Sequence, residues 1–241
     1  MQESARPRSQ GARFFGRSPL TADSRPWYLG ALGELDVAGR LAALGPEWVV
    51  LHSVPVGTRG SDIDHVLIGP AGVFTVNTKH HAGGRVWVGG QRLMVNGQKT
   101  DHLRNARHEA SRAERLLRAA LGEEVSVRAV VVVVGARSVT FRSRPEDVSV
   151  VTAPQVVRWL RKQKPILEQA EVFRIAEAAS VGATWSAEPG PIADESSFVA
   201  LQEEVESARR VRMTWVAALA VGTVALGASL ALDPLSRLLG S

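Results

Sequence analysis

The fold is decided by the stretch at residues 62–79, DIDHVLIGPAGVFTVNTK. Two apolar runs flank a Gly-Pro-Ala-Gly segment, a pattern that predicts two antiparallel strands joined by a tight turn. Acidic residues open the first strand, and Asn77 and Lys79 close the second. Because the outer ends of such strands lie side by side, we expect a carboxylate, an amide and an ammonium group to meet at one edge of a sheet.

Helix and strand patterns alternate on both sides of this hairpin. The expected helices are 27–44, 101–121, 154–164 and 165–181. The other expected strands are 47–54, 85–88, 91–95, 128–134 and 148–151. Since residues 128–134 (RAVVVVV) are typical of a strand buried on both faces, the pattern predicts a layered α/β domain over 27–183.

Composition narrows the classes of protein to which the chain can belong. Among its 241 residues, 45% are apolar, as in globular proteins, and the net charge of +5 favours a polyanionic partner or an anionic membrane. The absence of cysteine excludes disulfides, thiolate metal sites and cysteine nucleophiles. The spacing of the histidines does not match that of zinc ligands, so we expect these residues in loops and on the surface. We expect His65 to lie behind the polar residues of the hairpin and to support their positions.

The two ends of the chain differ from the domain between them. Residues 1–26 are rich in arginine and lack the apolar run of a signal peptide, which predicts a disordered basic arm. Residues 184–212 predict a linker followed by a charged juxtamembrane helix over 197–212. Residues 233–241 form a short tail.

Residues 213–232, MTWVAALAVGTVALGASLAL, contain no charged residue and have the length of a transmembrane helix. Arg209, Arg210 and Arg212 precede them, so the positive-inside rule predicts a single-pass anchor in the cytoplasmic membrane with the N-terminal domain in the cytoplasm. The spacing of Ala218 and Gly222 suggests helix pairing in a homodimer. The alternative interpretation is a buried helix of a soluble domain.

The polar residues of the hairpin fit metal-assisted cleavage of a phosphodiester. That chemistry needs hard oxygen ligands for Mg²⁺ or Mn²⁺ and positive charge near the phosphate. Asp64 is the expected central ligand, with Glu34 from the first helix as a second acid. Lys79, on the same strand face as Asn77, would hold the attacking water or the phosphate. Asp62 is more simply interpreted as a cap of the preceding loop.

Residues from about 27 to 121 resemble the nuclease-related (NERD) domain, a branch of the PD-(D/E)XK restriction-endonuclease-like superfamily. The matching pieces are Gly33-Glu34, residues 62–70, residues 72–74, Thr78-Lys79 and the helix opening at Asn105. The resemblance implies a restriction-endonuclease-like mixed central sheet flanked by helices, and divalent-metal-dependent hydrolysis of DNA. It also implies that Glu34, Asp64 and Lys79 inherit the acidic and basic roles of the family.

The chain departs from the family pattern at two positions. Asn77 stands where the family usually has a carboxylate two residues before the lysine, and Glu109 lies near a position where the family often has glutamine. We therefore expect Glu109 to supply the missing metal ligand from the neighbouring helix. The plainer interpretation makes Glu34 and Glu109 solvated helix residues and Lys79 a strand end.

These observations leave several functions open. The first is a membrane-tethered, metal-dependent nuclease that acts on DNA at the cytoplasmic side of the membrane. The second is a catalytically impaired descendant that uses a relict nuclease fold to bind nucleic acid or to dock a protein. The third is a membrane-anchored scaffold whose arginines contact anionic lipid.

Overall fold

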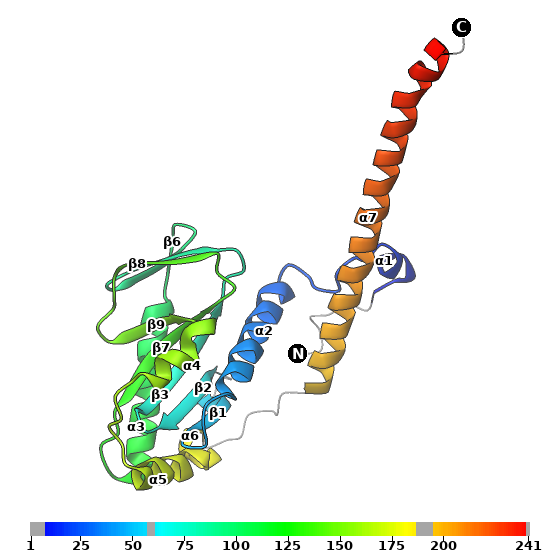
Figure 1. Ribbon diagram of the computed structural model, residues 1–241. Coiled ribbons are helices and arrows are strands. Elements are labelled where there is room, and N and C mark those ends of the chain that lie inside the picture. Colours follow the sequence, from blue (N-terminus) through cyan, green and yellow to red (C-terminus); the bar gives the residue numbers. More distant parts are fainter. Residues whose placement is uncertain (1–7, 57–60, 187–194, 240–241) are drawn as a thin grey trace. The chain divides into compact units, whose positions relative to one another are not determined.

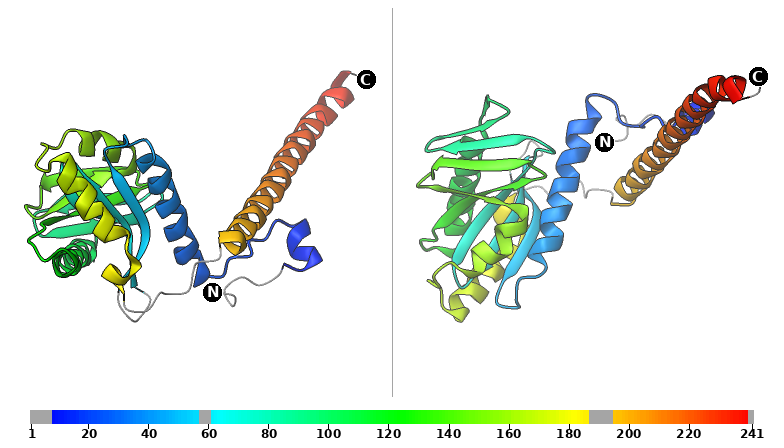
Figure 2. Two further views of the ribbon diagram at one scale, coloured as in Figure 1. Left: turned by 90° about the horizontal axis from the view of Figure 1, so that it is seen from below. Right: turned by 45° about the horizontal axis from the view of Figure 1, so that its top comes forward.

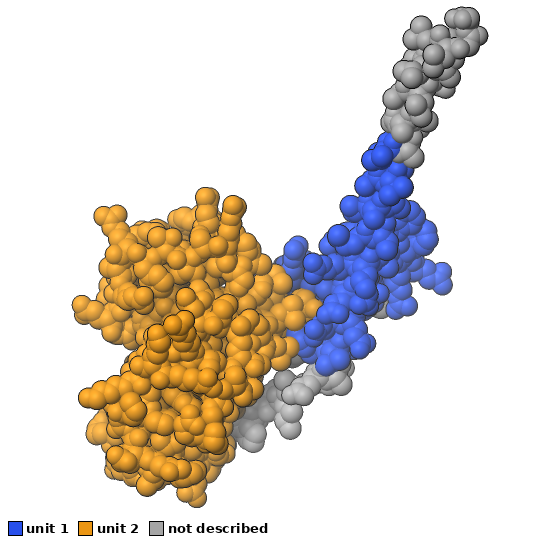
Figure 3. Space-filling view, viewed as in Figure 1, with its two compact units in different colours: residues 1–27, 192–241 blue, residues 28–191 orange. Residues whose placement is uncertain are grey.

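The computed structural model describes residues 8–56, 61–186 and 195–239, with side chains placed for residues 8–56, 62–186 and 198–224 (Figure 1). The chain divides into two compact units, residues 28–191 and residues 1–27 together with 192–241 (Figure 3). Each unit is described below by itself. The boundary at 27/28 falls next to the predicted start of the domain at residue 27.

A five-stranded mixed sheet forms the centre of the larger unit, in the order β1-β2-β3-β7-β9. The hairpin β2–β3 and β1 pair antiparallel, whereas β3, β7 and β9 pair parallel. The strands are β1 (Val49–Val56), β2 (Ser61–Gly69), β3 (Gly72–His80), β7 (Val127–Val134) and β9 (Val148–Thr152). The predicted mixed central sheet is therefore confirmed.

The turn between β2 and β3 explains why residues 69–72 are Gly-Pro-Ala-Gly. Gly72 has φ +116°, a conformation that side chains other than glycine's rarely adopt. The carbonyl of Pro70 accepts hydrogen bonds from the backbone of Ile166 and Leu167, at 2.8 and 3.0 Å. The turn is thus bonded to the segment before α5, which fixes one end of the hairpin.

Helices cover both faces of this sheet (Figure 2). Helices α3, α5 and α6 pack on one face in a core that includes Val66, Val73 and Val131. Helices α2 and α4 pack on the other face, over Phe74 and Val130. The helices are α2 (Ser24–Leu41), α3 (His102–Leu121), α4 (Val156–Arg161), α5 (Gln169–Ser180) and α6 (Gly182–Trp185), with the 3-10 turn η1 (Ala153–Gln155) before α4.

A second, four-stranded mixed sheet corrects the expectation of one central sheet. Its order is β6-β5-β4-β8. The strands are β4 (Arg85–Gly89), β5 (Arg92–Val95), β6 (Gln98–Thr100) and β8 (Ser138–Ser143). The hairpin β4–β5 was predicted, but β6 and β8 were not. The residues of β8 are half-buried or exposed, so this strand depends on pairing with β4, about fifty residues earlier in the chain, rather than on a local apolar run.

The smaller unit consists of α1 (Gln10–Phe14) and α7 (Glu195–Leu239), which contact each other. Ser9 caps α1, and the indole nitrogen of Trp215 donates to the carbonyl of Phe14 at 2.7 Å. Gly16 has φ +63°, and a Cβ added there would lie 2.5 Å from the carbonyl oxygen of Ala208. The predicted disordered arm therefore contains a short helix that packs on α7, while residues 1–7 lie outside the described part.

The predicted charged helix over 197–212 is part of α7, and so is the predicted transmembrane span 213–232. Within the residues that the structure describes, no helix is both long and apolar enough to cross a membrane. Residues 225–232 of the predicted span and residues 187–194 of the predicted linker are outside the part for which side chains are described.

Candidate active site

Strands β2 and β3 diverge at the place where the predicted site residues lie. Their pairing ends at His65 and Val76, although β2 and β3 continue alongside their other neighbours, β1 and β7. Asp64 and Asn77 are the first residues beyond the last pair. The divergence exposes backbone groups between the two strands and gives polar side chains room to converge.

The carboxylate of Asp64 crosses this gap. Its Oδ2 accepts a hydrogen bond from the backbone N–H of Thr78 at 2.5 Å. Burial raises the pKa of Asp64, while this hydrogen bond and the positive charge of Lys79 oppose the rise. The bond fixes the position of the carboxyl group and leaves Oδ1 for another partner.

Asn77 and Glu109 form a direct contact between β3 and α3. The amide nitrogen of Asn77 donates to Oε1 of Glu109. The remaining oxygens, Asn77 Oδ1 and Glu109 Oε2, are buried and have no hydrogen-bond partner in the described part of the chain. Burial raises the pKa of Glu109, whereas the bond from Asn77 lowers it.

Glu34 reaches the site from α2, which packs on the opposite face of the sheet. Its neighbour Gly33 lies against the end of β3, where an added Cβ would be 3.1 Å from Cβ of His80. Burial and the negative charge of Asp64 raise the pKa of Glu34 to about 7, and Lys79 acts in the opposite direction. Glu34 therefore lies within electrostatic reach of both groups.

Lys79 is the cation common to these carboxyl groups. Its charge lowers the pKa values of Glu34, Asp64 and Glu109, so it lies within electrostatic reach of all three. Lys79 follows Asn77 by two residues on β3, which places both side chains on one face of the sheet. The structure thus brings together all five residues that the sequence singled out, from β2, β3, α2 and α3.

The donor set fits a hard divalent cation. Asp64 Oδ1, Asn77 Oδ1 and Glu109 Oε2 are oxygens, and two of these atoms are buried without a partner, which is costly unless something else satisfies them. No group of three or more His, Cys, Asp or Glu side chains in the described residues could hold a metal ion. A metal centre here would therefore need the amide oxygen of Asn77 in addition to the carboxylates.

Two histidine pairs were not predicted. Nε2 of His81 lies 3.1 Å from Nε2 of His102, and Nδ1 of His52 lies 2.8 Å from Nδ1 of His65. His65 is buried in β2, and burial lowers its pKa to about 3. Burial, followed by the charge of Lys79, lowers the pKa of His102 to about 4. No local sequence pattern predicts either pair, because the two histidines of each pair lie on separate elements.

Comparison with known protein families agrees with this geometry. Residues 29–134 match the model of a family described as nuclease-related domain. The matched segment contains the whole site, from Glu34 to Glu109. Neither the search of curated proteins nor the search of solved structures gave a match. The match covers less than half of the chain and shows that residues 29–134, which contain the candidate site, are similar to the nuclease-related domain.

Proposed function

We propose that the unit of residues 28–191 is a divalent-metal-dependent nuclease that hydrolyses phosphodiester bonds of DNA. The observation that carries the proposal is the pair of buried, unpartnered oxygens of Asn77 and Glu109 beside Asp64 and Lys79. Three carboxyl groups around one ammonium group would leave excess negative charge when ionised, which a divalent cation would offset. The match to the nuclease-related domain family points to the same class of reaction.

Each residue has a distinct part in this proposal. Asp64, Asn77 and Glu109 would hold Mg²⁺ or Mn²⁺, and Glu34 would complete the acidic set. When bound, the ion supplies a Lewis acid for a phosphate oxygen and acidifies a coordinated water. The ammonium group of Lys79 orients the attacking water and offsets the negative charge that develops on the phosphate.

The test uses the full chain with labelled single-stranded and linear duplex DNA in Mg²⁺ or Mn²⁺. We expect cleavage that chelator abolishes and that Asp64→Asn or Lys79→Ala lowers by about a hundredfold or more, the usual cost of removing such a group. Glu146→Gln is the matched control, because Glu146 is an exposed acid in the connection from β8 to β9, outside the site. Cleavage that survives both chelator and Asp64→Asn would contradict the proposal.

A second function is favoured by Asn77 itself. An amide oxygen ligates a cation without bringing charge, so metal affinity falls relative to a site with a further carboxylate. The domain would then bind nucleic acid, or dock a protein, without cleaving. Retention of DNA without cleavage, unaffected by chelator, would select this function. A chain that neither cleaves nor binds DNA, yet associates with membranes, would select the scaffold.

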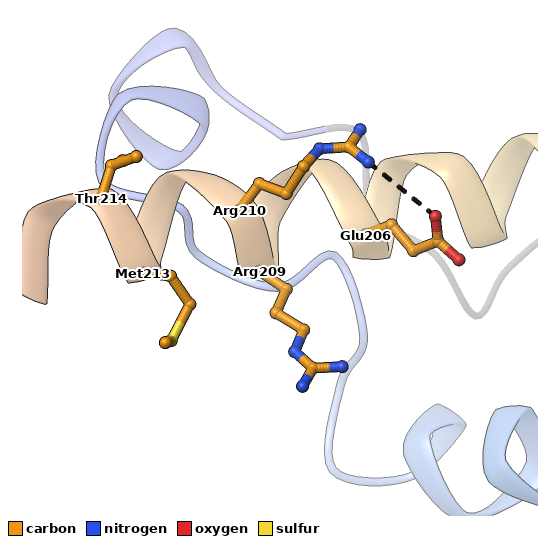
Figure 4. Close-up of a pocket in the computed structure, with 5 residues that line it drawn as sticks. All are labelled: Glu206, Arg209, Arg210, Met213 and Thr214. Carbon is orange, nitrogen blue, oxygen red and sulfur yellow. Dashed lines mark ion pairs between the residues drawn. The ribbon is translucent and has the colours of Figure 1, made fainter. Parts of the chain in front are cut away.

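We also propose that α7 tethers the protein to the cytoplasmic membrane, with the larger unit in the cytoplasm. Support comes from side chains that α7 leaves exposed beyond its arginines, including Leu219, Val221 and Val224, which are 67–73% exposed. Arg209 and Met213 project from one side of α7 and Arg210 pairs with Glu206, so charged and apolar residues adjoin there (Figure 4). Membrane fractions should retain the full chain, but not a chain ending at residue 212, after alkaline carbonate washing.

A further inference from the structure

The four-stranded sheet β6-β5-β4-β8, called here the basic sheet, carries an unbalanced positive charge. Residues 84–100 and 136–145 contain three cationic residues each and no Asp or Glu. All of these cations are exposed, and none forms an ion pair within the described part of the chain. They are Arg85, Arg92, Lys99, Arg137, Arg142 and Arg144. Such a surface is complementary to a polyanion.

One face of the basic sheet is packed and the other is open. Val86, Val88 and Leu93 belong to the apolar core. On the opposite face Trp87 pairs with Met94, which pairs with Lys99. Because paired residues on adjacent strands project from the same side of a sheet, these three side chains form a row across its open face.

The indole of Trp87 packs against Gly89 of the same strand. Gly89 is two residues further along β4, on the same side, and a Cβ added to it would lie 2.2 Å from the indole of Trp87. Only glycine leaves room for the ring in that position. The ring is half-buried, so one side rests on the strand and part of it stays accessible. An accessible indole amid cations is the combination that stacks unpaired bases and holds phosphates.

The basic sheet is attached to the candidate active site by its connecting segments. β4 follows β3 after residues 81–84, and β8 follows β7 after residues 135–137. Backbone hydrogen bonds join these connections, from Gly83 to Gly135 and from Arg137 to Gly84. The contact between His81 and His102 joins them to the start of α3. The open sheet therefore begins at the end of β3 that carries Lys79 (Figure 1).

We propose that the basic sheet binds single-stranded DNA, with phosphates on its arginines and lysine and one base stacked on Trp87, and leads the strand to the site at Lys79. The proposal deepens the proposed nuclease function, on which its catalytic meaning rests, by naming the surface that holds the substrate. A single strand is favoured over a duplex because only unpaired bases offer a face to the indole.

Binding is measured in chelator, so that it does not depend on cleavage. The full chain is titrated against a fluorescein-labelled oligothymidine, with fluorescence anisotropy as the readout, over a series of salt concentrations. We expect the double variant Arg85→Gln, Arg142→Gln to bind about tenfold more weakly at ~0.1 M salt. Its slope of log affinity against log salt should be shallower by about 1.4, the loss of two phosphate contacts.

The matched control is the double variant Arg115→Gln, Arg158→Gln. Both arginines are exposed and free of ion pairs within the described residues, but they lie on α3 and α4. The control should bind within twofold of the unmodified chain. Equal losses in the two double variants would show that net charge alone drives binding, which would overturn the proposal.

The stacking part of the proposal has its own variants. Trp87→Ala should weaken binding about tenfold, within the usual range for one stacked base, whereas Trp87→Phe should retain most of the affinity. A thermal melt followed by circular dichroism shows whether either variant has lost its fold. Equal affinities of the folded Ala and Phe variants would contradict stacking on Trp87.

Failure of this proposal can be told apart from failure of the nuclease function. Cleavage that the basic-sheet variants leave unchanged, together with unchanged binding, would overturn the binding surface and leave the nuclease intact. Binding that depends on Trp87 and the arginines, in a chain that never cleaves, would support the surface and refute the nuclease. Asp64→Asn should lower cleavage by about a hundredfold or more without changing affinity in chelator.

Discussion

At the scale of single residues, the contact between Asn77 and Glu109 explains how the site can lack a carboxylate on β3. The amide of Asn77 holds one oxygen of Glu109 and leaves the other oxygen of each group buried and unpartnered. An acid on α3 thus lies against the side chain of Asn77, the position at which the family pattern has a carboxylate on β3. This contact is the arrangement that the hypothesis of Glu109 as the replacement ligand requires.

If Glu109 replaces a carboxylate on β3, then swapping the acid and the amide between positions 77 and 109 should preserve cleavage. Asn77→Glu combined with Glu109→Gln returns the acid to β3 and keeps an amide as its donor, so cleavage should be kept or raised. Asn77→Glu alone would place two carboxyl groups in contact and should lower the melting temperature in chelator, with recovery in Mg²⁺. Cleavage rates and thermal melts of the two variants check this. Loss of an existing activity in the double variant would refute the exchange.

The raised pKa of Glu34 predicts how the free energy of unfolding depends on pH when chelator is present. Its pKa is about 7 in the folded chain, above its ordinary value of 4.5, so the folded state binds more protons between these values. The stabilising contribution of Glu34 to the folded state is therefore fully present below about pH 4.5 and is lost as the pH rises through 7. Because Glu34 is partly exposed, Glu34→Gln should stabilise the chain by only ~1 kcal/mol at pH 8 and by nothing at pH 4. Chemical denaturation at both pH values measures the difference.

The sequence was sufficient to select these residues but not to describe their contacts. Asp64 and Lys79 stood out because acidic and basic groups flank an apolar hairpin, and strand alternation placed Lys79 beside Asn77. The hydrogen bond from Thr78 to Asp64 lies at the point where β2 and β3 diverge. The unpartnered oxygens of Asn77 and Glu109 lie there too. That divergence depends on pairing with β1 on one side and with β7 on the other, and β7 follows the hairpin only after three further strands and α3, so no local pattern predicts it.

At the scale of elements, the strongly periodic segments were predictable and the long-range pairings were not. The long amphipathic helix expected over 101–121 appears as α3, residues 102–121, and the buried valine run appears as β7. The first helix begins three residues earlier and ends three residues earlier than expected. β8 was missed because its half-exposed residues pack weakly, and because three strands and a helix separate it from its partner β4 in the chain.

The docking of α1 on α7 predicts a specific effect of one small substitution. Gly16→Ala would place a Cβ against the backbone of α7 and would strain a residue with positive φ, so α1 should detach. Trypsin should then cut faster at Arg13 and Arg17, and the emission of Trp215 should change. Gly11→Ala is the control, because no atom lies within 4 Å of its added Cβ. Equal proteolysis of the two variants would show that Gly16 is not needed for docking.

At the scale of the whole molecule, a metal ion should stabilise only the unit that contains the site. Mg²⁺ or Mn²⁺ at a hundred times its dissociation constant should add about 2.7 kcal/mol to the stability of that unit. Thermal melts with and without the ion would show the shift, and Asp64→Asn should lose it. An equal shift in Asp64→Asn would mean that the ion binds elsewhere.

The parallel pairing of β3 with β7 has a consequence for synthesis on the ribosome. Val73 lies beside Val127, and the chain between them builds the basic sheet hairpins and α3 before the partner strand is made. In the nascent chain, the edge of β3 that pairs with β7 therefore stays unpaired until the valine run of β7 has emerged. Nascent chains that end before residue 127 should depend on chaperones to stay soluble, because the strand that closes this edge has not yet been translated.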